Sequence, residues 1–246
     1  MKLRKRFTDI VEYLAGFPAF RKEVRAFGKL GYICHRRRIF NEWGVDLVLD
    51  VGANAGQFAE GIRKFYPGMI ISFEPIPFIY EDLEKASSGD PDWHVCNYAL
   101  GRQTAVQKLN VSKDTSFSSF LETNEYCDVR FGKDAVKTED VEVTIRSLQD
   151  VLPELVPDIR QRRVFLKMDT QGYDLEVFKG LGELKDSVVA LQSEISILPI
   201  YNEMPRWVES IHYYEMAGFS VAGLFPVTLD QCRVVEFDCL MVRKQH

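Results

Sequence analysis

The sequence predicts an α/β fold with a Rossmann-like, largely parallel sheet. Three observations support this prediction: a strand–glycine turn–helix unit near residue 50, an acid at the end of the next strand, and further strand-like runs that alternate with helical segments. In the first unit, the apolar run Val45 to Val51 precedes a turn with Gly52 and Gly56, and Gln57 to Phe65 has helical periodicity up to Pro67-Gly68. A chain of 246 residues can bury a full core as one such domain with an appendage.

The glycine turn differs from the dinucleotide-binding fingerprint G-x-G-x-x-G, because its glycines are spaced G-x-x-x-G and an aspartate stands two positions before the first. Glycine is expected at both positions because a side chain there would keep a ligand from the main chain. N–H groups at the start of the following helix can hold an anionic group. The pattern Asp-x-Gly-x-x-x-Gly resembles the S-adenosylmethionine site of Rossmann-like methyltransferases, which implies donor contacts from Asp50, Gly52, Ala53, Asn54 and Gly56.

A second acid agrees with this interpretation. The run Met69 to Phe73 is the next predicted strand and ends at Glu74, 22 positions after Gly52. An acid about 20 residues beyond the glycine turn is placed to accept hydrogen bonds from both hydroxyls of a ribose. Glu74 and the following Pro75 are therefore expected at the cofactor. The alternative is an ordinary α/β unit with a surface glutamate.

The N-terminal segment is basic, although the whole chain has a net charge of −5. Residues 1–45 hold eleven Lys/Arg and four Asp/Glu. Phe7 to Leu14 has the spacing of an amphipathic helix and Phe20 to Phe40 that of a second, so residues 1–44 are expected to form a helical cap beside the cofactor cleft. The triplet Arg36-Arg37-Arg38 is either a solvated helix face or a contact for phosphate, an anionic lipid or an acidic substrate.

The third strand is predicted from Trp93 to Leu100, after a helix over Phe78 to Ala86. Ligands of a doubly wound sheet bind beyond the carboxyl ends of its strands, so Asn97 and Tyr98 are expected to face the adenine. Asn97 either hydrogen-bonds the adenine edge or stabilises a turn.

Residues 101–163 are more than a crossover helix requires and are predicted to form an insertion. Its two alternating runs, Ala105 to Val111 and Val141 to Ile145, are predicted strands. The hydroxyl-rich stretch between them contains Ser118 and Ser119, which either belong to a surface turn or contribute hydrogen bonds to an acceptor pocket.

The rest of the chain continues the alternation of strands and helices. The predicted elements are the helix Leu148 to Leu155, the strand Val164 to Asp169, the helix Leu175 to Leu181, the strand Val188 to Glu194, the helix Trp207 to Met216, and the strands Gly218 to Phe225 and Val235 to Val242. Alternation along the fourth strand places Lys167 and Asp169 on one face, so Asp169 or a neighbouring carboxylate can balance the buried lysine.

Asp169 and Glu194 end the fourth and fifth strands. If these strands are adjacent, the two carboxylates lie side by side at the carboxyl edge, about 5 Å apart at the backbone. Such a pair suits a general base or a divalent cation, although one member can simply balance Lys167. No dense ligand cluster requires a metal, and none is expected.

Cysteine usage and the N-terminus predict a cytoplasmic protein. The five cysteines form no C-x-x-C pair and are expected to be reduced thiols without zinc. Asp9 and Glu12 interrupt the first apolar stretch, so no signal peptide is expected. No stretch has the length of a membrane span.

Five segments occur in order between Asp46 and Arg243: Asp50 to Asn54, Phe73 to Pro75, Ala99 to Gly101, Leu166 to Tyr173 and Phe237 to Arg243. Together they resemble the FkbM family of S-adenosylmethionine-dependent methyltransferases. The resemblance implies a class I methyltransferase sheet of seven strands with an antiparallel last strand, S-adenosylmethionine as cofactor, and acceptor hydroxyls on sugars, polyketides and related metabolites. The chain departs from the family at Gln171, where other members often carry the glutamate of Asp-x-Glu-Gly.

The predicted function is an O-methyltransferase for a small molecule or glycan. In-line transfer needs the acceptor oxygen behind the methyl group, and positioning alone corresponds to effective molarities of about 10⁵ M or more. Asp169 is expected to remove the hydroxyl proton, which contributes about 10²- to 10⁴-fold, with Glu194 as the second carboxylate. Ser118, Ser119 and Gln171 are expected to bind the acceptor.

Two other functions remain open. A macromolecular methyltransferase would use the basic N-terminus to hold RNA or a protein. The turn Asp169-Thr170-Gln171-Gly172 is not the Asn/Asp-Pro-Pro-aromatic turn of enzymes that methylate nucleic-acid nitrogens, so nucleic acid is not expected as a partner. The third function is S-adenosylmethionine binding without catalysis. A homo-oligomer is compatible with the sequence.

Overall fold

The computed structural model describes residues 21–244, with side chains from residue 30 onward. The chain divides into two units, residues 1–42 and 43–246. In the first unit, helix α2 (Arg21–Glu42) agrees with the predicted second helix, while the predicted helix Phe7 to Leu14 lies outside the described residues. Within α2, Arg38 forms an ion pair with Glu42 at 2.6 Å. The cap predicted for residues 1–44 stays a prediction.

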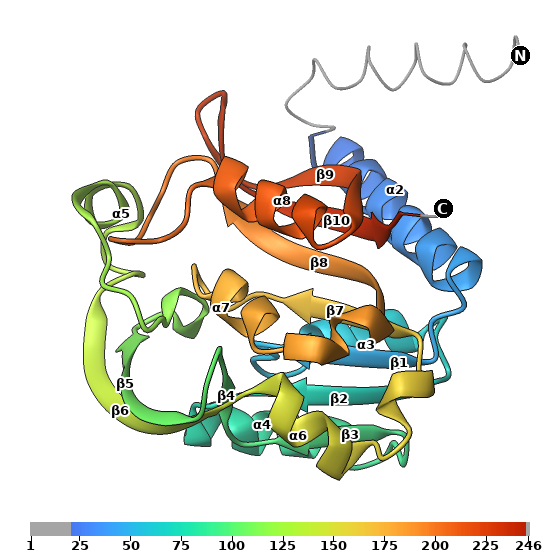
Figure 1. The fold of residues 1–246 in the computed structure, drawn as a ribbon. Helices are drawn as coiled ribbons and strands as arrows, with labels where there is room; N and C mark the ends of the chain where they lie inside the picture. The colour runs from blue at the N-terminus through green and yellow to red at the C-terminus, as the bar shows by residue number, and fades with distance from the viewer. Residues whose placement is uncertain (1–20, 245–246) are drawn as a thin grey trace, which may run out of the picture. The chain divides into compact units, whose positions relative to one another are not determined.

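A seven-stranded sheet forms the centre of the second unit (Figure 1). Its strands are β1 (Leu47–Val51), β2 (Met69–Phe73), β3 (Trp93–Cys96), β7 (Val164–Met168), β8 (Val188–Ser196), β9 (Phe219–Asp230) and β10 (Arg233–Arg243). They lie in the order β3-β2-β1-β7-β8-β10-β9. The last strand, β10, runs antiparallel to both β8 and β9, whereas β3, β2, β1, β7 and β8 are parallel. The prediction of a seven-stranded sheet with an antiparallel last strand is confirmed.

The apolar runs form strands because helices cover both faces of the sheet. All residues of β1 and β7 are buried, as is typical of parallel strands between two helical layers. On one face, α6 (Leu148–Leu155), α7 (Asp174–Lys179) and α8 (Trp207–Met216) contribute to the main hydrophobic core (Figure 1). On the other face, Phe58 of α3 (Gln57–Arg63) stacks on Phe165 of β7, with ring centroids 6.4 Å apart.

The prediction of one continuous strand from Trp93 to Leu100 is wrong, because the chain leaves the central sheet after Cys96. The side-chain amide of Asn97 donates to the main-chain oxygens of Glu74, at 2.9 Å, and Pro75, at 3.3 Å. These bonds hold the chain in a bend at the end of β2. The residues after the bend therefore join a different sheet.

That second sheet has the order β4-β6-β5 and is built mainly from the insertion. β4 (Ala99–Leu100) pairs parallel to β6 (Lys137–Arg146), and β5 (Ala105–Ser112) pairs antiparallel to it, so the two strands predicted here are confirmed. Buried residues of these strands pack with Ile76 and Ile79 at the start of α4 (Pro77–Ser87). The small sheet is thereby anchored beside the carboxyl end of β2.

The segment between β5 and β6 contains a 3-10 turn, η2 (Thr115–Phe117), and a helix that the sequence analysis did not predict, α5 (Glu125–Phe131). This helix begins where Asn124 Oδ1 accepts the N–H of Cys127 at 2.9 Å, an N-cap bond. Cys127 is buried with Ile200 and Tyr201, which follow β8, and with Val235 of β10. The insertion thus packs against segments that follow it by about 70 to 110 residues in the sequence.

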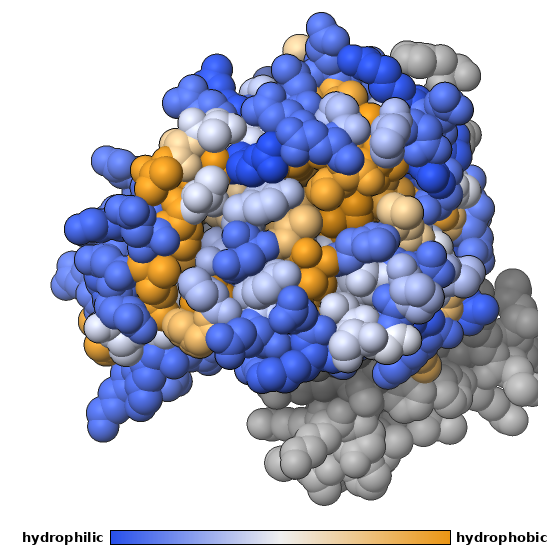
Figure 2. Space-filling view, turned by 90° about the horizontal axis from the view of Figure 1, so that it is seen from below, coloured by the Kyte–Doolittle hydropathy of each residue, from blue (hydrophilic) through white to orange (hydrophobic). Residues whose placement is uncertain are grey.

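The surface carries apolar side chains on the side of the insertion. Figure 2 views the molecule from below. It shows apolar residues on the side where Figure 1 places β5 and β6. Exposed apolar side chains of this region include Val106, at 64% exposure, and Val136, at 54%. Among the helices that the structure describes, none combines the length and apolar character needed to cross a bilayer.

Candidate active site

The site lies where β1 and β7 are neighbours and the chain leaves them toward opposite faces. Helix α3 follows β1 on one face, and α7 follows β7 on the other. Ligands of parallel sheets bind at such a switch point, beyond the carboxyl ends of the strands. The residues that follow Val51, Phe73 and Met168 are therefore the candidate site.

Gly52 and Gly56 are both required by the protein's own packing. Their φ angles are 71° and 93°, in the left-handed region that favours glycine. A Cβ on Gly52 would lie 2.0 Å from the main-chain oxygen of Asp169, and one on Gly56 would lie 2.8 Å from the indole of Trp93. The structure thus supplies a different reason for these glycines than access of a ligand: they let the turn after β1 lie against the turn after β7 and against β3.

Hydrogen bonds tie the glycine turn to the end of β2. The N–H groups of Gly52 and Ala53 both donate to Phe73 O, at 3.1 and 3.0 Å. The N–H of Asn54 donates to Glu74 Oε2 at 2.9 Å. These N–H groups are already engaged within the protein. The donors available to an anionic group at this turn are therefore the N–H groups at the start of α3.

Glu74 is buried at the end of β2, with 4% exposure. Besides the bond from Asn54, its Oε1 accepts the N–H of Ile76 at 3.0 Å. Burial raises the pKa of the carboxyl group to about 7, against the effect of these two hydrogen bonds. An ionised carboxylate has about four acceptor positions, so two remain for hydroxyl donors. This set of acceptors fits the two hydroxyls of a ribose.

Asn97 and Tyr98 lie at the bend after β3. The side-chain nitrogen of Asn97 is engaged with the main chain of Glu74 and Pro75, so the structure favours the turn-stabilising alternative for this residue. The ring of Tyr98 packs on Phe73 with centroids 5.7 Å apart, and burial raises the pKa of its phenol. Contact of either side chain with an adenine stays a prediction.

Lys167 lies behind the site and is balanced by two carboxylates. Its Nζ is 3.0 Å from Asp50 Oδ1 and 3.6 Å from Asp169 Oδ2, and it donates to Gly52 O at 2.8 Å. Burial lowers the pKa of Lys167, but Asp50 and Asp169 outweigh this effect and hold it above its usual range. Asp50 is completely buried and also accepts a bond from Ser72 Oγ at 3.3 Å. The Asp50 carboxylate therefore contacts Lys167, whereas the Asp169 side chain is 39% exposed.

Asp169 and Glu194 lie side by side, as predicted. β7 pairs with β8 in a register that places Met168 opposite Ser193, one residue before each acid. The side-chain nitrogen of Gln171 lies between them and donates to Asp169 Oδ1 at 3.2 Å and to Glu194 Oε2 at 2.7 Å. Burial, together with the charge of Asp169, raises the pKa of Glu194 well above its usual range. The Asp169 side chain of this pair is 39% exposed.

Ser119 of the insertion and Tyr201, which follows β8, hold Gln171 from the other side. Tyr201 OH lies 2.9 Å from Gln171 Oε1 and 3.0 Å from Phe117 O, and Ser119 Oγ donates to Gln171 O at 2.6 Å. Ser118 Oγ accepts the N–H of Ser112 at 3.1 Å. Both serine hydroxyls are thus engaged in joining the insertion to itself and to the site, and their contact with an acceptor stays a prediction.

Asp174 is a structural residue of the site that the sequence analysis missed. Its Oδ1 accepts bonds from the N–H and the hydroxyl of Thr170, at 2.8 and 2.6 Å. Its Oδ2 accepts bonds from Ser193 Oγ at 2.8 Å and from the N–H of Glu194 at 3.0 Å. This one buried side chain fixes the turn after β7 against β8. Its signal in the sequence was an acid at the start of a helix, a position where acids stabilise the helix terminus.

Within residues 21–244, no three His, Cys, Asp or Glu side chains are grouped so that they could hold a metal ion. The acidic groups around Gln171 are instead spaced by hydrogen-bond donors and balanced by Lys167. The chemistry that this arrangement offers is that of a carboxylate base beside a buried cation.

Comparison with known proteins gives a family match over most of the chain. The family described as Methyltransferase FkbM domain matches residues 50–213. A curated relative, Methyltransferase sdnD of Sordaria araneosa, is 30% identical over 163 residues, which cover 55% of this chain and 60% of that protein. The match thus leaves two fifths of that relative's length outside it.

Two solved structures illustrate the structural similarity. Magnesium protoporphyrin IX methyltransferase from Synechocystis PCC 6803, with bound S-adenosylmethionine, has 11% identity and a TM-score of 0.44, over 94% of this chain and 88% of that one. Fibrillarin from Aeropyrum pernix, with natively bound S-adenosylmethionine, has 11% identity and a TM-score of 0.43, over 80% and 66%. Similarity at this level says nothing about an acceptor.

Proposed function

This chain belongs to the FkbM methyltransferase family, and we propose that it methylates a hydroxyl oxygen of a small molecule or glycan. The methyl donor of the family is S-adenosylmethionine. One observation carries the choice of oxygen: a partly exposed carboxylate, Asp169, stands at the switch point of the sheet beside the buried Lys167. An alcohol needs a base to become a good nucleophile, and a carboxylate in hydrogen-bond reach supplies it.

The donor would be held at the carboxyl ends of β1 and β2. Glu74 has two acceptor positions left for ribose hydroxyls, and the main-chain bond from Asn54 keeps its carboxylate beside the glycine turn. The N–H groups that open α3 remain for the carboxylate of the amino-acid end. When bound, the donor supplies a methyl group activated by a sulfonium. Asp50 serves this site indirectly, since its carboxylate balances Lys167.

The acceptor hydroxyl would lie against Asp169. Gln171 donates to Oδ1 of this carboxylate and Lys167 lies near Oδ2, so both oxygens have a fixed orientation. The acceptor positions that remain on this carboxylate would take the proton of the acceptor hydroxyl. Burial and the neighbouring charge of Asp169 raise the pKa of Glu194, so Glu194 is the less suited of the two carboxyl groups to act as the base. The five cysteines are free thiols, which is ordinary in a reducing compartment, and we place the reaction in the cytoplasm.

Labelled methyl transfer tests this proposal. The full chain is incubated with methyl-labelled S-adenosylmethionine and separate panels of sugars, polyketide-type alcohols, RNA and protein, and the product is analysed for an O–CH₃ group. An O-methylated sugar or metabolite supports the proposal. Label in RNA or protein, or at nitrogen or carbon, would replace it with the macromolecular or a different small-molecule activity. S-adenosylmethionine binding without transfer to any panel would favour a non-catalytic role.

A further inference from the structure

Tyr201 contacts the side chain of Gln171 and has no role in the function proposed above. It lies in the segment after β8, and its side chain is 2% exposed. Its hydroxyl is 2.9 Å from Gln171 Oε1 and 3.0 Å from Phe117 O, and both of these oxygens are acceptors. A phenol has one proton to donate. A hydroxyl that served packing alone would need only Phe117 O, so its place beside Gln171 calls for a separate reason.

The surrounding chain holds Tyr201 in place independently of its hydroxyl. The residue forms an antiparallel bridge with Thr123 of the insertion, and the N–H of Asn124 donates to Ile200 O at 3.1 Å. The side chain is buried in one cluster with Cys127. Burial also raises the pKa of the Tyr201 phenol well above its usual range, so the hydroxyl remains a hydrogen-bond donor well into the alkaline range.

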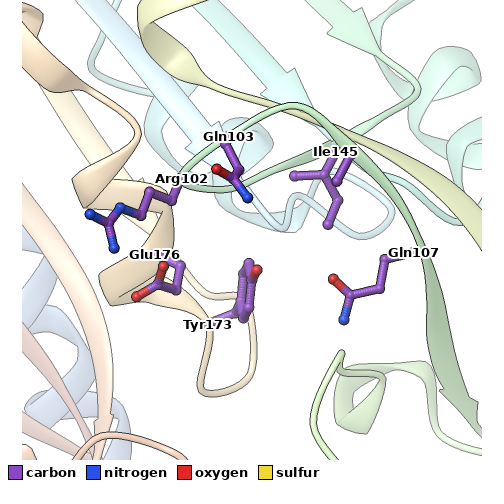
Figure 3. A pocket seen from close by; sticks show the side chains of 7 residues that line it. Arg102, Gln103, Gln107, Ile145, Tyr173 and Glu176 are labelled. Carbon is purple, nitrogen blue, oxygen red and sulfur yellow. The ribbon is translucent and has the colours of Figure 1, made fainter.

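The backbone at Gln171 is also held without the Tyr201 hydroxyl. Its φ of 52° lies in the left-handed region that disfavours a side chain, and its carbonyl accepts the bond from Ser119 Oγ at 2.6 Å. Further along the turn, the Tyr173 ring packs on Phe120 with centroids 4.9 Å apart. Figure 3 shows this ring and Ile145 in the wall of a cavity of about 340 Å³. What the hydroxyl of Tyr201 adds is therefore control of the Gln171 side chain.

The amide of Gln171 has one orientation that suits its neighbours. Its nitrogen donates to Asp169 Oδ1 at 3.2 Å and to Glu194 Oε2 at 2.7 Å, while its oxygen faces the Tyr201 hydroxyl. Within residues 21–244, no second donor reaches that oxygen. A reversed amide would direct its oxygen, which cannot donate, at the two carboxyl groups. The hydroxyl and the carboxyl groups therefore select the same orientation.

We propose that Tyr201 is a positioning residue of methyl transfer: its hydroxyl holds the Gln171 amide, which in turn holds the Asp169 carboxylate toward the acceptor hydroxyl. This inference rests on the proposed function. A displacement of about 1 Å at a reacting group can cost about 10²-fold in rate, so loss of the hydroxyl should slow methyl transfer. Donor affinity should be unchanged, because none of the donor contacts proposed above involves Tyr201 or Gln171.

NMR of the Gln171 side-chain amide tests the contact without an acceptor. The full chain, labelled with ¹⁵N-glutamine and saturated with the demethylated donor product, gives a signal that is assigned by its absence in Gln171→Gly. Exchange of the amide protons with water should be about ten-fold faster in Tyr201→Phe, which keeps the ring and loses the hydroxyl. Tyr66→Phe is the matched control, because Tyr66 is 4% exposed and its hydroxyl donates to Met69 O at the start of β2, away from the site.

Single-turnover methyl transfer to the acceptor panels tests what the contact does. Tyr201→Phe should transfer about ten- to hundred-fold more slowly than the wild type, with unchanged affinity for S-adenosylmethionine by calorimetry. Because Tyr201 acts through Gln171, the two losses should not add, and Tyr201→Phe should change the rate of Gln171→Gly by less than about two-fold. Glycine is used at residue 171 because it suits the left-handed backbone there, so this variant should fold.

The outcomes separate this inference from the proposed function. Equal amide exchange in the wild type and Tyr201→Phe overturns the positioning role and leaves the methyltransferase standing. Faster exchange with an unchanged transfer rate also overturns it, as do losses of rate that add in the double variant. If the wild type transfers no methyl group to any panel, the proposed function is refuted and the role of Tyr201 in the reaction falls with it, whatever the amide exchange shows.

Discussion

The side-chain amide of Gln171 donates to the carboxyl group of Glu194 over 2.7 Å, and the same nitrogen reaches Asp169 at 3.2 Å. A neutral donor therefore lies between two carboxyl groups on neighbouring strands: Asp169 directly follows β7, and Glu194 lies within β8, which continues to Ser196 and so is longer than the predicted strand Val188 to Glu194. The amide of Gln171 supplies a hydrogen-bond donor that both carboxyl groups use. The amide also fixes the direction in which Asp169 faces the candidate acceptor site.

Gln171→Glu should destabilise the protein at pH 7. The substitution removes the donor shared by Asp169 and Glu194 and adds a third carboxyl, at a cost of about 1–3 kcal/mol. Repulsion among the three carboxyl groups raises their pKa values in the folded state. The folded variant then binds more protons than the unfolded variant, so its loss of stability should shrink as the pH falls from 8 to 5. Urea denaturation across this range measures it, with Gln161→Glu as the exposed control. Equal stability of both variants at pH 7 would contradict the bridging role.

Asp169→Asn should bind S-adenosylmethionine normally and lose turnover by about 10²- to 10⁴-fold, because the amide cannot accept the hydroxyl proton. Its oxygen can still accept the bond from Gln171, so the fold should be retained. Single-turnover kinetics and calorimetry give the two readouts. Asp186→Asn is the control, since the Asp186 side chain is 82% exposed. Full activity in Asp169→Asn would remove this residue from the role of base.

Glu74→Ala should abolish measurable binding of S-adenosylmethionine. The substitution removes the acceptors proposed for the ribose and releases the N–H groups of Asn54 and Ile76. Near-ultraviolet circular dichroism checks that the variant is folded, and Glu81→Ala, on the exposed side of α4, is the control for calorimetry. Near-native affinity in a folded Glu74→Ala protein would refute the ribose assignment.

The donor-free protein should lose stability as the pH rises through neutrality. Burial raises the pKa of Glu74 from 4.5 to about 7, so the folded state binds more protons than the unfolded state in this window. Stability that is present below pH 4.5 should decline by up to about 3 kcal/mol by pH 8. Glu74→Gln removes this titration, and its stability should vary less with pH. Parallel pH profiles of the two proteins in urea denaturation would contradict the elevated pKa.

Gly52→Ala should be strongly destabilising. Its φ of 71° disfavours a side chain, at a cost of about 1–3 kcal/mol, and the new Cβ would collide with the main-chain oxygen of Asp169. Gly61→Ala is the matched comparison, because Gly61 lies within α3 and a Cβ there meets nothing within 4 Å. That variant should be more stable than the wild type by up to about 1 kcal/mol. Similar denaturation midpoints for the two variants would rule out the close contact between the turns.

The sheet and the positions of its acids follow from local patterns in the chain. Apolar runs, glycine spacing and the distance from Gly52 to Glu74 are properties of neighbouring residues, so they predict strands, turns and the carboxyl edge at which ligands bind. The adjacency of Asp169 and Glu194 follows too, because a short crossover helix between two parallel strands places them next to each other. The same patterns cannot distinguish a residue that faces a ligand from one that faces the protein.

The features that local patterns do not predict are contacts between residues far apart in the sequence. Asp50 faces Lys167, across 117 residues, because the register of β1 and β7 pairs these two positions. Ser119 reaches Gln171 because the insertion folds back over the turn after β7, and Tyr173 forms a cavity wall only when Phe120 and Ile145 are packed around it. Such contacts depend on strand register and on which surfaces are buried together. Those are properties of the whole folded chain, and no short stretch of residues contains them.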